Sequence, residues 1–179
     1  MSGLTIFLLL IIICGSLSIV FFINYGKITY YVNKITYAEN LISEDVNKKA
    51  KLLVKINNVM KKTLHAKKDY LAGINDLKDD QMDVHDKDEM LNTYTNTVKN
   101  LISDYTKLAN HKELKKLTSN LYDINEKLDA SKIYFNKYMK ELSSLSTTFP
   151  TNIISKIVRV NIKPLYPENE ITSNMNQDL

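Results

Sequence analysis

A chain of 179 residues is long enough for one domain with accessory segments, and its four scattered glycines exclude a phosphate-binding glycine loop. The formal net charge is +4 at pH 7, carried almost entirely by lysine, since Arg159 is the one arginine. A single cysteine, Cys14, excludes a disulfide within the chain, so the cysteine count does not indicate a compartment.

The first feature along the chain is an uncharged run. Residues 1–3 form a short tail, and residues 4–23 follow without a charged side chain, fifteen of the twenty being Leu, Ile, Val or Phe. A helix of that length spans about 30 Å, the thickness of the hydrocarbon core of a bilayer. We therefore predict a transmembrane helix over residues 4–23, with the lipid bilayer as its partner.

Two other uses of an apolar N-terminal run are disfavoured. A cleaved signal peptide needs a basic start and small residues at its cleavage site, whereas residues 1–3 are uncharged and residues 24–26 are Asn, Tyr and Gly. A lipoprotein would be acylated on Cys14, but the preceding Ile13 is too bulky for such processing.

Flanking charge predicts the orientation of the span. No Lys or Arg precedes it, while Lys27 and Lys34 follow before the first acidic residue, Glu39. By the positive-inside rule, the N-terminus then lies outside the cell membrane and the C-terminal domain lies in the cytoplasm (N-out, C-in).

Apolar residues at steps of three and four predict long helices after the span. A stripe from Ile28 to Leu64 continues the span as one rod, with Gly26 as the place of any bend. Residues 73–89 form an acidic connection, in which Asp86 or Asp88 caps the next helix. That second helix runs from Leu91 to about residue 110.

The third helix carries the strongest pattern in the chain. Ten of eleven heptad positions between Leu114 and Phe149 are apolar or aromatic, and Ser131 is the exception. Pro150 ends this helix and opens a short fourth one to Val158. Five such heptads predict coiled-coil-like packing, either within the chain or across a homo-oligomer.

The predicted fold class is therefore all-α. An N-terminal transmembrane helix precedes an antiparallel bundle of long helices over residues 24–162, and residues 163–179 form a disordered tail.

Several positions resemble the LemA family, a group of bacterial proteins with one N-terminal membrane helix and a helical bundle. Residues 121–160 carry the clearest likeness, with a Phe-Pro-x-Asn element at the end of the heptad helix. In the N-terminal half, Lys48 and Lys49 stand where the family has two basic residues, and Lys132 stands for a family Arg. Matching positions that we interpret as structural are Asn33, Ala38, Leu128, Phe135, Asn136, Phe149, Pro150 and Asn152.

The resemblance implies a fold, a single-pass anchor and often a cytoplasmic bundle, but no settled biochemical activity. Some relatives are encoded beside membrane peptidases, so a membrane peptidase is a candidate protein partner. At the C-terminal element, we expect Phe149 to pack into the bundle end and Asn152 to bond to loop backbone.

A lysine-rich run offers a candidate surface for an anionic partner, either lipid headgroups or nucleic acid. The alternative is a solvated helix face in a lysine-rich protein. We expect no nucleic acid, because the run lacks a recognition motif and interleaved aromatic residues. The face comprises Lys48, Lys49, Lys51, Lys55, Lys61 and Lys62.

Catalytic chemistry has no recognisable constellation in the sequence. The acidic run at Asp83–Glu89 fits neither a zinc site nor an EF-hand loop, which needs a central glycine. We therefore expect no enzyme activity, no cofactor and no metal. The leading hypothesis is a membrane-anchored scaffold or adaptor that binds other proteins, and the alternative is a basic module for anionic partners.

Overall fold

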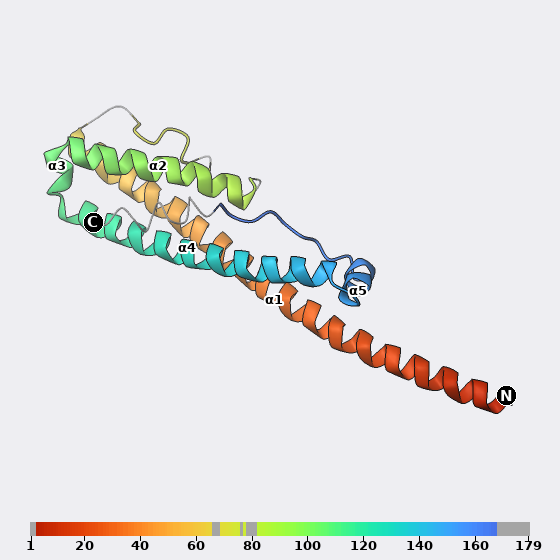
Figure 1. The fold of residues 1–179 in the computed structure, drawn as a ribbon. Coiled ribbons are helices and arrows are strands. Elements are labelled where there is room, and N and C mark those ends of the chain that lie inside the picture. The colour runs from red at the N-terminus through yellow and green to blue at the C-terminus, as the bar shows by residue number, and fades with distance from the viewer. Residues whose placement is uncertain (1–2, 66–68, 76, 78–81, 168–179) are drawn as a thin grey trace. The chain divides into compact units, whose positions relative to one another are not determined.

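The protein consists of helices joined by turns and extended segments, in a computed structural model that describes residues 3–65, 69–75, 77 and 82–167. The helices, labelled in Figure 1, are α1 (Gly3–Leu64), α2 (Val84–Asp104), α3 (Thr106–Ala109), α4 (Lys112–Thr147) and α5 (Thr151–Ile157). The all-α prediction is confirmed. Two compact units share the chain: Met1–Ala38 with Tyr134–Tyr166, and Glu39–Ile133 with Pro167–Leu179.

The first unit begins with the apolar part of α1. No proline lies between Gly3 and Leu64, and the helix continues through Gly26 without interruption. Side chains 4–23 are exposed, apart from the half-buried Phe21. Among the described residues, α1 is the one helix that is long and apolar enough to cross a membrane.

In the same unit, the C-terminal part of α4 runs antiparallel to α1. Tyr37 meets Tyr134 edge to face with ring centroids 6.4 Å apart, and Tyr30 meets Tyr138 in the same way at 6.4 Å. From the first pair to the second, the residue number falls along α1 and rises along α4, so the two helices are antiparallel. The C-terminal end of α4 therefore lies beside the end of the apolar run.

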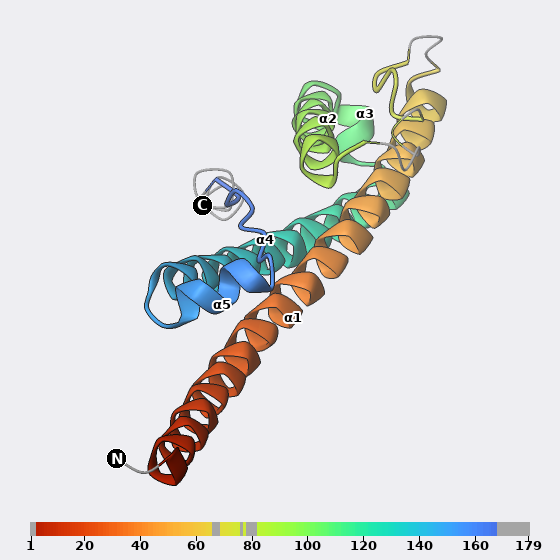
Figure 2. The same ribbon diagram turned by 90° about the vertical axis from the view of Figure 1, so that its right-hand side faces the viewer.

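Helix α5 follows α4 across a cis peptide bond between Phe149 and Pro150, and Figure 2 shows this turn. Thr151 Oγ1 donates a hydrogen bond of 2.9 Å to Asn24 Oδ1, which ties α5 to α1. Phe149 is 76% exposed, so our expectation that it packs into the bundle end is wrong. The reason is the turn at residues 149 and 150, after which Thr151 and Ile154, rather than Phe149, are buried.

An extended segment then returns along α4. The Asn136 side chain donates a hydrogen bond of 2.8 Å to the Tyr166 carbonyl and accepts one of 2.9 Å from the Tyr166 amide. The Tyr166 ring meets Phe135 at 5.3 Å. Residue 166 is therefore held against α4, although we predicted a disordered tail from residue 163. The remainder of that predicted tail, 168–179, lies outside the described residues.

The second unit packs α2 against residues 39–64 of α1 and the first half of α4. Lys87 Nζ at the start of α2 donates a hydrogen bond of 2.8 Å to Asn47 Oδ1 of α1. Helix α2 then runs in the same direction as α1, while α4 runs antiparallel to both (Figure 1). The core consists of buried Leu, Ile, Val and Met side chains, each worth about 1.5–3 kcal/mol relative to exposure.

The connection from α1 to α2 makes this parallel pairing feasible. Its described residues include buried Leu71, Ile74 and Leu77, so the connection covers part of the core. Gly73 adopts a φ of 85°, a left-handed conformation that glycine tolerates best. Asp83 caps α2 by accepting a 2.8 Å hydrogen bond from the His85 amide. The prediction of Asp86 or Asp88 as the cap is therefore wrong, because α2 begins earlier than its apolar stripe.

The heptad stripe of α4 is confirmed in its burial. One set of positions is buried throughout, and the alternate set is half-buried. The helix ends at Thr147, two residues before Phe149. The predicted second helix instead divides at Tyr105, whose extended backbone (φ −117°, ψ 102°) separates α2 from α3. The buried heptad positions of α4 are Leu114, Leu121, Leu128, Phe135 and Leu142.

The two hydrogen bonds between the Asn136 side chain and the Tyr166 backbone, here called the Asn136 clamp, yield a prediction for the first unit. Replacing Asn136 with Leu removes both hydrogen bonds to Tyr166, so we expect faster exchange of the Tyr166 amide hydrogen. Hydrogen exchange on the full chain in detergent measures this rate, with Asn120→Leu at an exposed α4 position as the control. An unchanged rate in the Asn136 variant would show that the clamp does not hold the segment.

Candidate functional site

A buried charge cluster joins the three long helices of the second unit. The Asp88 carboxylate on α2 accepts a hydrogen bond of 3.0 Å from Lys49 Nζ of α1 at one oxygen. Its other oxygen accepts from Lys132 Nζ of α4. The side chains of Lys49 and Asp88 are only 1% and 3% exposed. The ion pairs are therefore separated from water and screened little by salt.

Further groups complete this cluster. Lys49 Nζ also donates to Asn92 Oδ1 one turn along α2, and the buried Asp129 carboxylate of α4 acts on Lys49 electrostatically. The formal charges of two lysines and two aspartates balance when all four are ionised.

Burial and charge oppose each other in setting protonation within the cluster. Burial lowers the pKa of the Lys49 ammonium, and the Asp88 carboxylate works against that shift. Burial on its own would raise the pKa of Asp88. The ammonium groups of Lys49 and Lys132 outweigh that effect and leave the Asp88 pKa below its ordinary value. Asp88 is therefore an anion at neutral pH.

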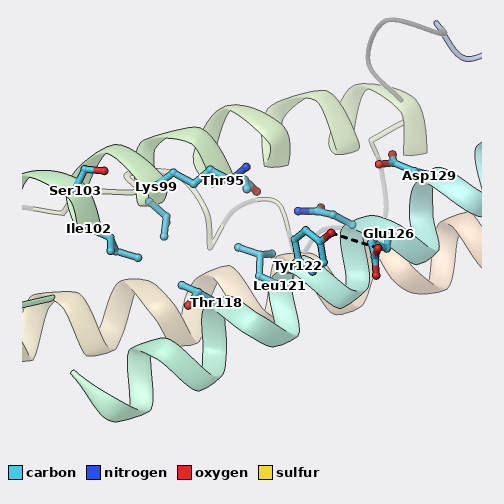
Figure 3. A pocket seen from close by; sticks show the side chains of 11 residues that line it. Thr95, Lys99, Ile102, Ser103, Thr118, Leu121, Tyr122, Glu126 and Asp129 are labelled. Carbon is cyan, nitrogen blue, oxygen red and sulfur yellow. Dashed lines mark hydrogen bonds between the residues drawn. The ribbon is translucent and has the colours of Figure 1, made fainter. Parts of the chain in front are cut away.

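A pocket of about 450 Å³ opens between α2 and α4, in the same unit (Figure 3). Asp129 is part of its lining, so the charge cluster is continuous with the pocket wall. Val98, Ile102 and Leu121 supply an apolar surface. Tyr122 and Glu126 lie on α4 and are joined by a hydrogen bond of 3.3 Å (Figure 3). The other lining residues are Thr95, Lys99, Ser103, Thr118 and Asn125.

The side-chain oxygen of Asn125, in the pocket lining, has no protein partner among the described residues. Asn125 is about nine-tenths buried, and its Oδ1 accepts no hydrogen bond there. A buried carbonyl oxygen without a donor costs about 1–3 kcal/mol. A ligand that carries an N–H or O–H group into the pocket would remove this cost. The pocket therefore combines an apolar wall with several polar groups, among them the unmet Asn125 acceptor, which is typical of sites for amphipathic groups.

The structure divides the predicted anionic-partner face. Lys49 is not part of any solvent-exposed face, because its ammonium lies in the charge cluster. Lys48 pairs with Glu44 and Asp45 at 2.8 and 2.9 Å, and Lys61 pairs with Asp69 at 2.7 Å. The members that remain exposed without an acidic partner in these ion pairs are Lys51, Lys55 and Lys62.

The family-motif positions fall into two groups. Four are buried, and three of these are Ala38, Leu128 and Phe135 in the apolar core. Asn136, the fourth, clamps Tyr166. Asn33 and Phe149 are exposed, and Pro150 is half-buried at the start of α5. Asn152 Oδ1 is buried and has no hydrogen-bond partner among the described residues, so that oxygen does not make the loop contact that we expected.

The charge cluster was not identified from the sequence, because charged residues are normally assigned to the surface and not to buried helix positions. Asp88 lies three residues before Leu91 and seven before Thr95, so it continues the buried stripe of α2. Lys49 adjoins Ala50 on the α1 stripe, and Lys132 lies four residues after Leu128. The signal was a charged residue in a core register on each of three helices, with opposite signs.

Comparison with known proteins adds one finding. The sequence model described as the LemA family matches residues 38–177, most of the chain. Searches of curated proteins and of solved structures found no match.

The cluster predicts a large difference between two neighbouring aspartates on α2. Asp88→Asn leaves two buried ammonium groups without their shared anion, which we expect to lower the free energy of unfolding by about 3–5 kcal/mol. Asp86→Asn, at an exposed position in the first turn of α2, should change it little. Urea unfolding of the full chain in detergent, followed by circular dichroism, measures both.

A compensating change identifies charge as the cause. Adding Lys132→Met to Asp88→Asn removes one of the two ammonium groups and leaves Lys49 with the Asp129 carboxylate, so we expect part of the stability to return. Equal losses in Asp86→Asn and Asp88→Asn would contradict the role of the cluster.

Proposed function

This chain belongs to the LemA family, and we propose that it is a single-pass membrane protein whose bundle is a non-catalytic adaptor for other proteins. The apolar run of α1 supports the membrane anchor. All side chains of residues 4–23 except the half-buried Phe21 are exposed, an arrangement that is costly in water and favourable in lipid. Lys27 and Lys34, which flank the run on one side only, favour a cytoplasmic bundle.

The pocket between α2 and α4 carries the adaptor proposal. Its volume of about 450 Å³ suits one large side chain or a small organic group. The apolar wall and the Asn125 oxygen together suit a Trp or Tyr, since each combines an aromatic body with a hydrogen-bond donor. Such residues are the usual anchors of protein–protein interfaces. We therefore propose that a partner protein, with a membrane peptidase as a candidate, inserts an aromatic anchor here.

The basic-module alternative has weaker support. Three of its six lysines are either buried or paired with acidic residues, which reduces the positive charge offered to a partner. Two of the remaining exposed lysines, Lys55 and Lys62, line a pocket of about 250 Å³, but the Glu113 carboxylate also lines it and disfavours an anion there.

Orientation is tested by protease added outside intact cells. We expect a C-terminal tag to be protected, because the flanking lysines retain the bundle in the cytoplasm. A cytosolic protein that stays intact is the control for lysis. Digestion of the tag while that control survives would reverse the orientation and restrict partners to the cell envelope.

The adaptor proposal is tested by placing a photo-crosslinking amino acid, benzoylphenylalanine, at two α2 positions in cells. We expect a product from Ile102, which lines the pocket, and none from the exposed Asn96. Filling the pocket with Thr118→Phe should abolish the product by steric exclusion. Ser119→Phe, at the exposed neighbouring position, should leave it intact.

Two results would contradict the pocket as the docking site. One is a product from Ile102 that survives Thr118→Phe. The other is equal crosslinking from Ile102 and Asn96, which indicates contact without use of the pocket.

A further inference from the structure

The turn between α4 and α5 presents apolar side chains to the outside of the first unit. Phe149, Ile153 and Ile157 are 76%, 53% and 64% exposed, at intervals of four residues. The opposite side of α5 packs inward through Thr151, Ile154 and Ser155. This short helix therefore has its larger apolar surface on the outside, the reverse of a helix that faces water.

Contacts within the first unit locate this turn at the end of the apolar run of α1. The pairing of the two antiparallel helices proceeds from Tyr37 with Tyr134 to Tyr30 with Tyr138. The next contact is the 2.9 Å hydrogen bond from Thr151 to Asn24. Asn24 directly follows the exposed apolar residues 4–23. The α4–α5 turn thus lies next to the end of the segment that we propose to be in the membrane.

The charges around this turn match a phospholipid surface. Lys156 and Arg159 are exposed beside the apolar side chains, and Lys27 is exposed on α1 three residues after Asn24. No acidic residue occurs from Leu142 to Pro167. Apolar side chains flanked by basic ones are typical of helices that lie in the interface of a bilayer with anionic lipid.

We propose that the α4–α5 turn is a second membrane contact, in which Phe149 and Ile153 enter the interface of the bilayer beside α1. This inference rests on the proposed transmembrane role of residues 4–23. The lipid surface is the occupant favoured by the position next to Asn24 and by the basic flanks. The hydrogen bond between Thr151 and Asn24 then fixes α5 at the depth where the span ends.

Site-directed spin labels on the full chain in vesicles with anionic phospholipid test this contact. Cys14→Ser removes the one native cysteine, and single labels are attached at Phe149→Cys and Ile153→Cys. Accessibility to oxygen and to a water-soluble nickel chelate gives the depth of each label. We expect about 5–10 Å below the phosphates for both. Glu141→Cys, exposed on α4 about two turns earlier, should report an aqueous position.

A label at Ile12→Cys separates failure of this inference from failure of the anchor. If Ile12 reports the bilayer centre while 149 and 153 report water, the second contact is absent and the anchor stands. If Ile12 also reports water, the anchor itself is wrong. Labels at 149 and 153 that are shielded from both oxygen and nickel would show coverage by protein and overturn the proposal.

Discussion

One carboxylate, that of Asp88, connects the three long helices of the second unit. It meets the ammonium groups of Lys49 and Lys132, which belong to helices of opposite direction. Heptad packing alone allows helices to slide by a turn at modest cost, because one leucine can replace another. A buried ion pair does not allow this, because a displaced charge would lie in the core without a partner. The cluster therefore fixes the register that the apolar stripes leave open.

Periodicity in the sequence was sufficient to predict the apolar run, the two longest helices and most of the core, but not the start of α2 or its separation from α3 at Tyr105. The stripe from Ile28 to Met60 and the heptads from Leu114 to Leu142 are buried largely as their spacing indicates. The direction of α2 was not accessible, because a long connection is compatible with either direction. The connection between α1 and α2 covers part of the core on its way back to the start of α2, as the burial of Leu71 and Leu77 shows.

The candidate site was harder to predict than the fold, for a physical reason. A lysine on a helix is usually solvated, so Lys49 resembled its exposed neighbours Lys48 and Lys51 until Asp88 was placed beside it. The role of Asn125 could not be predicted for the same reason, because only its surroundings in the fold show that its side-chain oxygen is buried without a donor. Conversely, Phe149 looked like a core residue because an aromatic side chain normally avoids water. Phe149 is instead exposed, and under the proposed membrane contact the surroundings of its ring are lipid rather than water.

The long sequence separations within the cluster have a consequence for synthesis on the ribosome. Lys49 and Asp88 are 39 residues apart, and Asp88 and Lys132 are 44 apart. The chain emerges N-terminus first at about 5–20 residues per second, so α1 and α2 are made several seconds before the last partner. Until Lys132 and Asp129 emerge, Lys49 and Asp88 lack half of their cluster, and water remains their better solvent. Closure of the bundle is thereby delayed until most of the nascent chain is available, with α1 already synthesised.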